Sequence, residues 1–113
     1  MAITKVYAHV SCKSLEISIA WYAKLFGRKP DTRPMPGLAE WHYGDGAGIQ
    51  LFEDAGHAGS STLTLGVTDV AEERSRLSSS GVSPGEIEDA KEFRICRMRD
   101  PDQNLVVLAG PKS

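Results

Sequence analysis

The feature that most limits the possible fold is a repeated order of predicted elements. Hydrophobic periodicity predicts a strand, a helix and three strands in about residues 1–54, and the same order again in about residues 61–110. The helix-ending glycines Gly27 and Gly81 are 54 residues apart, and the strand segments that begin at Ile49 and Val106 are 57 residues apart. These two spacings differ by only three residues, as expected for a duplicated βαβββ module with short insertions. Chance similarity of two short strand–helix units is the alternative.

Local signals set the expected boundaries within each module. Alternation of apolar and polar residues predicts strands at residues 5–12, 38–43, 49–53, 62–67, 93–99 and 105–109, and more weakly at 86–89. Pro30, Pro34 and Pro36 mark a loop or an edge strand before residue 38. A helix over residues 15–26 is expected to be capped by Ser14 and ended by Gly27. A second helix begins at Asp69, where Glu72 completes a capping-box pattern, and runs to about Ser79. Together these elements predict an α+β fold in a single domain of 113 residues.

Composition excludes several classes of function. The chain carries 13 Lys and Arg against 15 Asp and Glu, so it has no excess of cations for a nucleic-acid partner. Its longest apolar run, residues 105–109, is far shorter than the ~20 residues of a membrane-spanning helix, so we expect no membrane partner. No signal peptide is visible at the start, and two cysteines make no disulfide framework. We therefore expect a cytoplasmic protein with reduced thiols.

Three segments carry a resemblance to a known family. They are SLEISIAWYAKLFG at residues 14–27, VTDV at residues 67–70 and DPDQNLV at residues 100–106. In this order and spacing they resemble motifs of the vicinal oxygen chelate superfamily, which includes glyoxalase I, bleomycin resistance proteins, fosfomycin resistance enzymes and extradiol dioxygenases. The resemblance implies two βαβββ modules that form a curved mixed sheet around a cavity. It also implies a homodimer, because the cavity is often completed between two copies.

The resemblance further implies where a metal would be held, with one ligand on each of four strands. Carried over by position, these ligands fall on Tyr7, Gln50, Thr62 and Val107. First-row divalent metals prefer imidazole nitrogen and carboxylate oxygen, which none of these four side chains provides. Gln50 is a weak neutral ligand, and His9 could substitute at one position only if the register shifted. We therefore expect no bound metal and no cofactor.

The function predicted from these observations is metal-independent binding of a small apolar or aromatic molecule. The residues expected to contact the ligand are Tyr7, His9, Trp41, Gln50, Thr62, Thr64 and Val107. Trp41 could line the cavity or pack in the core, because the sequence does not show which face of its strand points inward. His42 shares a strand face with Glu40 and could pair with that carboxylate. No catalytic residue is assigned.

Two alternatives remain at this point. One is a metal-dependent lyase, isomerase or dioxygenase with atypical ligands, such as His9 and Gln50. The other is a module that contacts another protein and encloses no small ligand. A fold alone does not decide between them, because one fold can carry many functions.

Overall fold

The structure is a computed structural model, and it describes residues 1–112. Its elements follow one another in the repeated order predicted from the sequence. They are β1 (Val6–Cys12), α1 (Leu15–Phe26), β2 (Thr32–Met35), β3 (Leu38–Tyr43), β4 (Ala47–Glu53), the short 3-10 helix η1 (Ala55–His57), β5 (Thr62–Gly66), α2 (Val70–Ser79), β6 (Ile87–Ala90), β7 (Phe93–Arg99) and β8 (Leu105–Pro111). Neither α-helix of the described residues is long and apolar enough to span a membrane.

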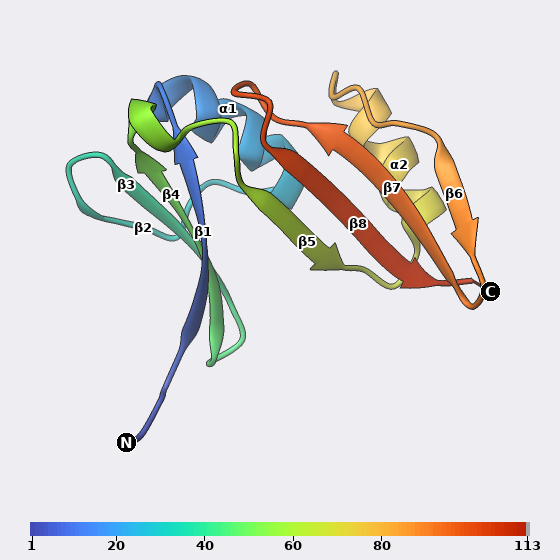
Figure 1. Cartoon of the computed structure of the whole chain (residues 1–113), viewed down its shortest axis with the longest axis horizontal. Coiled ribbons are helices and arrows are strands. Elements are labelled where there is room, and N and C mark those ends of the chain that lie inside the picture. Colours follow the sequence, from blue (N-terminus) through green and yellow to red (C-terminus); the bar gives the residue numbers. More distant parts are fainter. Residues whose placement is uncertain (113) are drawn as a thin grey trace.

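The strands form two four-stranded mixed sheets of identical topology (Figure 1). The first sheet has the order β1-β4-β3-β2 and the second has the order β5-β8-β7-β6. In each sheet the first and last strands of the module are parallel neighbours, and the remaining pairs are antiparallel. This confirms the predicted α+β fold of two βαβββ modules. The two sheets do not close on each other, so one chain alone does not complete the expected curved sheet around a cavity.

Both helices begin and end where the sequence predicts, although the N-terminus of α1 is capped by a different side chain. Gly27 ends α1 in the left-handed conformation (φ 74°), and the Asp69 side chain accepts a hydrogen bond from the backbone N–H of Glu72 at 3.0 Å. Gly81, just beyond α2, also has a positive φ of 89°. Ser14 lies at the predicted N-cap position of α1, but its side chain makes no capping hydrogen bond. Instead, the carboxylate of Glu53 at the end of β4 accepts from the backbone N–H of Leu15 at 2.8 Å.

Each helix covers one face of its own sheet, and this fixes which face remains for a ligand. In the first module, Tyr22 and Leu25 of α1 pack with Val10 and Leu51, and all four are almost fully buried. In the second module, Val70 and Leu77 of α2 are buried together with Val106, Leu108 and Cys96. The opposite face of each sheet has no helix of its own module upon it.

Both cysteines are free and buried in these cores. Burial is the main cause that raises the pKa of the Cys12 thiol to about 11, and burial also raises the pKa of Cys96. A buried thiol with a raised pKa carries little thiolate and is therefore a poor nucleophile. Neither cysteine belongs to a candidate site.

A turn at residues 100–104 fastens the second module to the first. Asn104, which is 1% exposed, donates to the backbone carbonyl of Ser11 at 3.0 Å. Its side-chain oxygen accepts from the backbone N–H groups of Gly59 and Ser61 in the connector at 3.0 and 2.9 Å. The sequence predicts this turn but not its role, because the contacts span more than 40 residues of chain.

Candidate functional site

The face of the first sheet that lies away from α1 carries a continuous row of polar side chains. His9 on β1 lies opposite Gln50 on β4, and Gln50 lies opposite Glu40 on β3. Since side chains two residues apart share a strand face, His42 lies beside Glu40 on the same side. We call His9, Gln50, Glu40 and His42 the polar row.

Hydrogen bonds link the polar row from end to end. His9 Nδ1 lies 3.2 Å from Gln50 Oε1, and Gln50 Nε2 donates to Glu40 Oε2 at 2.9 Å. His42 Nε2 lies 3.0 Å from Glu40 Oε1. Glu40 is only 7% exposed, and the hydrogen bond from His42 is the main cause that lowers its pKa, with the one from Gln50 adding to it. The centre of the row is therefore a carboxylate with both oxygens engaged.

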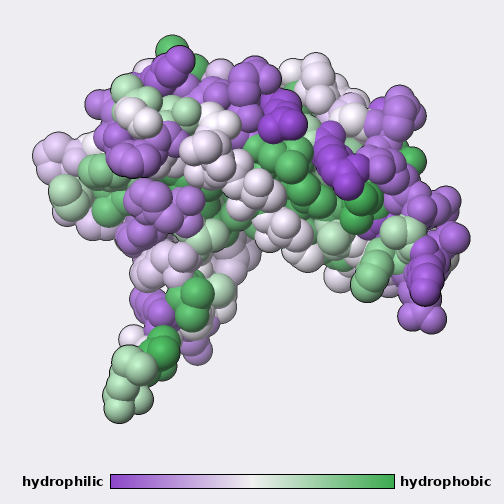
Figure 2. All heavy atoms as spheres, viewed as in Figure 1, coloured by the Kyte–Doolittle hydropathy of each residue, from purple (hydrophilic) through white to green (hydrophobic). Residues whose placement is uncertain are grey.

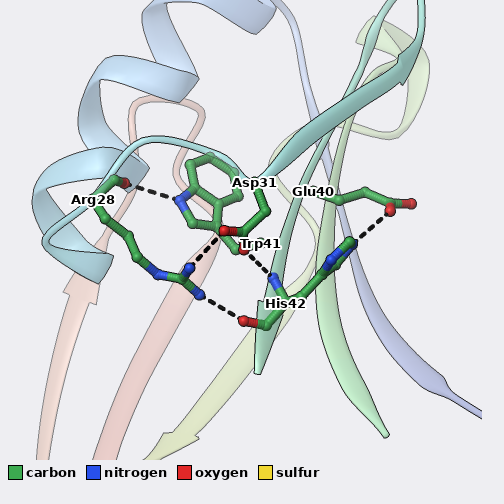
Figure 3. A network of polar contacts seen from close by, with 5 residues as sticks. All are labelled: Arg28, Asp31, Glu40, Trp41 and His42. Carbon is green, nitrogen blue, oxygen red and sulfur yellow. Dashed lines mark hydrogen bonds and ion pairs between the residues drawn. The ribbon is translucent and has the colours of Figure 1, made fainter. Parts of the chain in front are cut away.

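The backbone at His42 is held by the segment that follows α1 (Figure 3). Asp31 Oδ2 accepts from the backbone N–H of His42 at 2.6 Å, and this bond is the main cause that lowers the pKa of Asp31. Arg28 donates to the other oxygen of Asp31 at 2.7 Å and to the backbone carbonyl of His42 at 2.6 Å. These contacts fix the end of the polar row that is remote from His9.

Aromatic rings flank the polar row. The ring of Tyr7, two residues before His9, packs directly over Gly48, where an added Cβ would lie 2.6 Å from Tyr7 Cε1. The Phe52 ring, two residues after Gln50, has its centroid 5.9 Å from that of His9. The site thus combines hydrogen-bonding groups with flat apolar surfaces, which is the usual lining of a small-molecule site.

Trp41 does not belong to this face. It lies on the α1 side of β3 and is fully buried, and its Nε1 donates to the backbone carbonyl of Arg28 at 3.0 Å. Figure 3 shows its ring and the side chains of Glu40 and His42 on opposite sides of the strand. A ligand on the polar row would not contact Trp41. Of the two alternatives for this residue, Trp41 therefore packs in the core and is not the expected ligand contact.

The other three expected contact residues lie on the second sheet. Thr62 and Thr64 alternate with the buried Leu63, and Val107 alternates with the buried Val106 and Leu108. All three therefore lie on the face away from α2, where apolar residues gather. The half-buried apolar members of this face, which we call the apolar face, are Ile95, Leu105, Val107 and Ala109. Two exposed arginines of β7, Arg97 and Arg99, lie on the same face in register with Val107 and Leu105. Figure 2 shows hydrophobic residues gathered over β8 on this face, with hydrophilic residues beside them over β7.

A separate hollow lies between the two modules. It is a groove of about 810 Å³ lined mainly by apolar residues, among them Val6, Ala8, Ile49, Leu63 and Leu65. Val6 and Ala8 share the face of β1 that packs under α1 further along the strand, so the groove opens on the helix side. Of the expected contact residues only Thr64 lines it. The groove and the polar row are therefore separate features.

The residues at the four implied ligand positions do not fit a metal ion. Tyr7 and Gln50 lie on the first sheet, whereas Thr62 and Val107 lie on the second, and none of them is a carboxylate or an imidazole. Within residues 1–112, no group of three or more His, Cys, Asp and Glu side chains is placed to hold a metal. Glu40, the carboxylate nearest these positions in register, already accepts from two partners.

Sequence reasoning placed Tyr7, His9 and Gln50 on one face and considered the Glu40–His42 pair. It did not connect the pair with Gln50, because that connection depends on the register between β3 and β4. Phe52 was missed although it lies two residues after Gln50 on β4, so that strand alternation alone places it on the same face. A usable signal was the pair of polar residues Glu40 and His42, two positions apart in an otherwise apolar strand.

Comparison with known proteins gives the same fold. No family model and no curated relative matches the sequence. A glyoxalase/bleomycin resistance protein from Catenulispora acidiphila is 27% identical with a TM-score of 0.88, and the match covers 96% of this chain and 99% of that one. An antibiotic-binding protein from a Streptomyces species is 23% identical with a TM-score of 0.83, over 99% of both chains. The oxidase ChaP-H2 is 11% identical with a TM-score of 0.76, over 99% of this chain and 96% of that one.

Proposed function

Because this chain has the vicinal oxygen chelate fold of the glyoxalase/bleomycin resistance proteins, we propose that it binds a small apolar or aromatic molecule without a metal. The observation that carries the proposal is the polar row between the rings of Tyr7 and Phe52. Its groups are already hydrogen-bonded to one another, so they form a preorganised surface for an organic ligand. They do not offer a cation a set of oxygen and nitrogen atoms with free lone pairs.

We also propose that two copies form a homodimer that completes the site. Both sheets are open, so each chain presents four edge strands, β1, β2, β5 and β6, that are paired on one side only. The apolar face of the second sheet and the apolar groove are uncovered in one chain, and Val6 in the groove is 67% exposed. A partner that brings its second sheet against this chain's first sheet would enclose a ligand between the polar row and the apolar face.

Binding is tested by a thermal-shift screen of small aromatic molecules, followed by mapping of the hits with amide chemical shifts. We expect the affected amides to lie on β1, β3 and β4, and Tyr7→Ala to weaken binding at least about fivefold. Tyr43→Ala is the matched control, because Tyr43 is a half-exposed tyrosine that lines the groove instead. Shifts confined to the groove would contradict the proposal.

Metal independence has its own test. Protein expressed in metal-supplemented medium is assayed for Mn²⁺, Fe²⁺, Ni²⁺ and Zn²⁺ by elemental analysis, and the same ions are added in the thermal-shift screen. We expect substoichiometric metal and no stabilisation by the ions. Stoichiometric metal, or stabilisation by metal alone, would favour a metal-dependent enzyme instead.

The dimer is tested by light scattering during size-exclusion chromatography. We expect the mass of two chains for the wild type and of one chain for Ile95→Glu, which places a charge on the face of the second sheet that the partner would cover. Ile17→Glu is the control, since Ile17 on α1 is 63% exposed and lies outside that face. A monomeric wild type, or a dimer that survives Ile95→Glu, would contradict this arrangement.

A further inference from the structure

We infer that the ligand of this site carries a hydroxyl group on an aromatic or enolic ring, and that this hydroxyl donates a hydrogen bond to Nε2 of His9. The inference deepens the proposed function and rests on it. It follows from which groups donate and which accept in the polar row, assigned in order from Glu40 to Gln50 to His9.

The first step is the orientation of the Gln50 amide. Glu40 is a carboxylate, and an ionised carboxylate can only accept hydrogen bonds. The amide group 2.9 Å from Glu40 Oε2 must therefore be the NH₂ end of Gln50. This leaves the amide oxygen of Gln50 facing His9, at 3.2 Å from Nδ1. The alternative orientation would place two acceptors against each other at Glu40.

The second step is the tautomer of His9. The Gln50 oxygen is an acceptor, so His9 Nδ1 must supply the proton of that contact. A neutral imidazole has one N–H, and its other nitrogen is then an acceptor. His9 Nε2 is thus left with a lone pair, and within residues 1–112 no hydrogen bond reaches it. His9 is exposed on the face that carries the polar row, so this acceptor is accessible to a ligand.

The third step is the chemical class of the group that would meet this acceptor. Ethers and carbonyls offer no proton, whereas a phenol or enol hydroxyl is a strong donor to imidazole nitrogen. Phe52 beside His9 and Tyr7 further along the strand present ring surfaces, which suit a flat ligand. Glu40 already accepts from both His42 and Gln50, so the row does not require a cationic ligand.

The tautomer is measured without any ligand, from the imidazole ¹⁵N shifts of the three histidines. At a pH where the rings are neutral, we expect His9 to carry its proton on Nδ1. His42 is the internal control with the opposite expectation, since its Nε2 must donate to Glu40. Glu40→Gln frees the Gln50 amide to turn, so in this variant we expect His9 to shift toward the Nε2–H form. Wild-type His9 in the Nε2–H form would overturn the inference.

The ligand class is tested with two probes of nearly equal shape, 2-naphthol and 2-methoxynaphthalene. We expect the wild type to bind 2-naphthol about tenfold more tightly, which is the effect of one hydrogen bond to an otherwise unpaired group. In His9→Phe, which keeps a ring but removes the acceptor, the preference should fall to about one. Glu40→Gln should reduce the preference without abolishing the binding of 2-methoxynaphthalene.

The outcomes separate this inference from the proposed function. Equal binding of the two probes on β1, β3 and β4 would overturn the role of His9 and leave small-molecule binding intact. A preference that persists in His9→Phe would do the same. Failure of both probes to bind that face would overturn the inference and count against the proposed function.

Discussion

The phenol oxygen of Tyr22 donates to Oδ2 of Asp100 at 2.7 Å, and this bond joins α1 of the first module to the turn before β8 of the second. Tyr22 is fully buried and Asp100 is 2% exposed. Burial first, and then the hydrogen bond to Asp100, raises the pKa of Tyr22 far above its usual value. The same carboxylate accepts from the backbone N–H groups of Asp102 and Asn104, both at 2.9 Å. Asp100 is therefore the polar centre of the junction between the modules.

Removal of this bond should destabilise the protein to an extent that depends on which partner is lost. We expect Tyr22→Phe to lower the free energy of unfolding by about 2 kcal/mol, because one charge-assisted hydrogen bond is lost. Asp100→Ala should cost about 3 kcal/mol or more, because it leaves several buried donors unpaired. Urea denaturation of both single variants and the double variant measures their coupling. Additive effects of the two substitutions would contradict a direct interaction.

A second link between the modules is made by Arg76 of α2, which donates to the backbone carbonyls of Lys24 and Leu25 at 2.8 and 2.6 Å. We expect Arg76→Ala to increase amide hydrogen exchange at the end of α1 and to cost about 1 kcal/mol of stability. Arg74→Ala is the matched control, since Arg74 lies on the same helix but bonds the carbonyl of Gly85 within its own module. Faster exchange at the end of α1 in both variants would show that the contact of Arg76 is not the cause.

The packing of Tyr7 over Gly48 predicts a steric effect of a single methyl group. In Gly48→Ala the new Cβ would lie 2.6 Å from the Tyr7 ring and 3.2 Å from the carbonyl of Trp41. We expect the ring to be displaced, ligand binding to weaken, and stability to fall by about 1–3 kcal/mol. Gly66→Ala is the control, because a Cβ there meets nothing within 4 Å. Equal behaviour of the two variants by denaturation and ring chemical shifts would contradict this account.

Elements that depend on neighbouring residues could be predicted from the sequence, whereas contacts between residues far apart in the sequence could not. Helix α1 and strands β3 and β7 have the bounds predicted from local periodicity and turn residues. Ser14 is at the predicted N-cap position, but the acceptor for the backbone N–H of Leu15 is Glu53, 38 residues away in the sequence. Local patterns record nothing of such a contact, since it is created by the way α1 packs against the end of β4.

The candidate site shows the same limit. Alternation placed His9 and Gln50 on one face, because side-chain direction along a strand follows from local sequence. The face of Trp41 was not decided: β3 carries Trp41 and Tyr43 on one side and Glu40 and His42 on the other, and local sequence does not show which side a helix covers. The connection of Glu40 to Gln50 required the register of two strands, which is set by the turn between them and by the core beneath.

The hydrogen bonds at Glu40 predict a dependence of stability on acid. The folded pKa of Glu40 is lowered, so its stabilising contribution is present above the unfolded value of 4.5 and is lost as the pH falls through the lower folded value. Between about pH 6 and pH 3, the unfolding free energy of the wild type should therefore fall more steeply than that of Glu40→Gln, which does not titrate. Glu86→Gln, at a side chain that is 92% exposed, is the matched control and should follow the wild-type curve. Parallel curves for the wild type and Glu40→Gln in chemical denaturation would mean that the carboxylate is not held by His42 and Gln50 in solution.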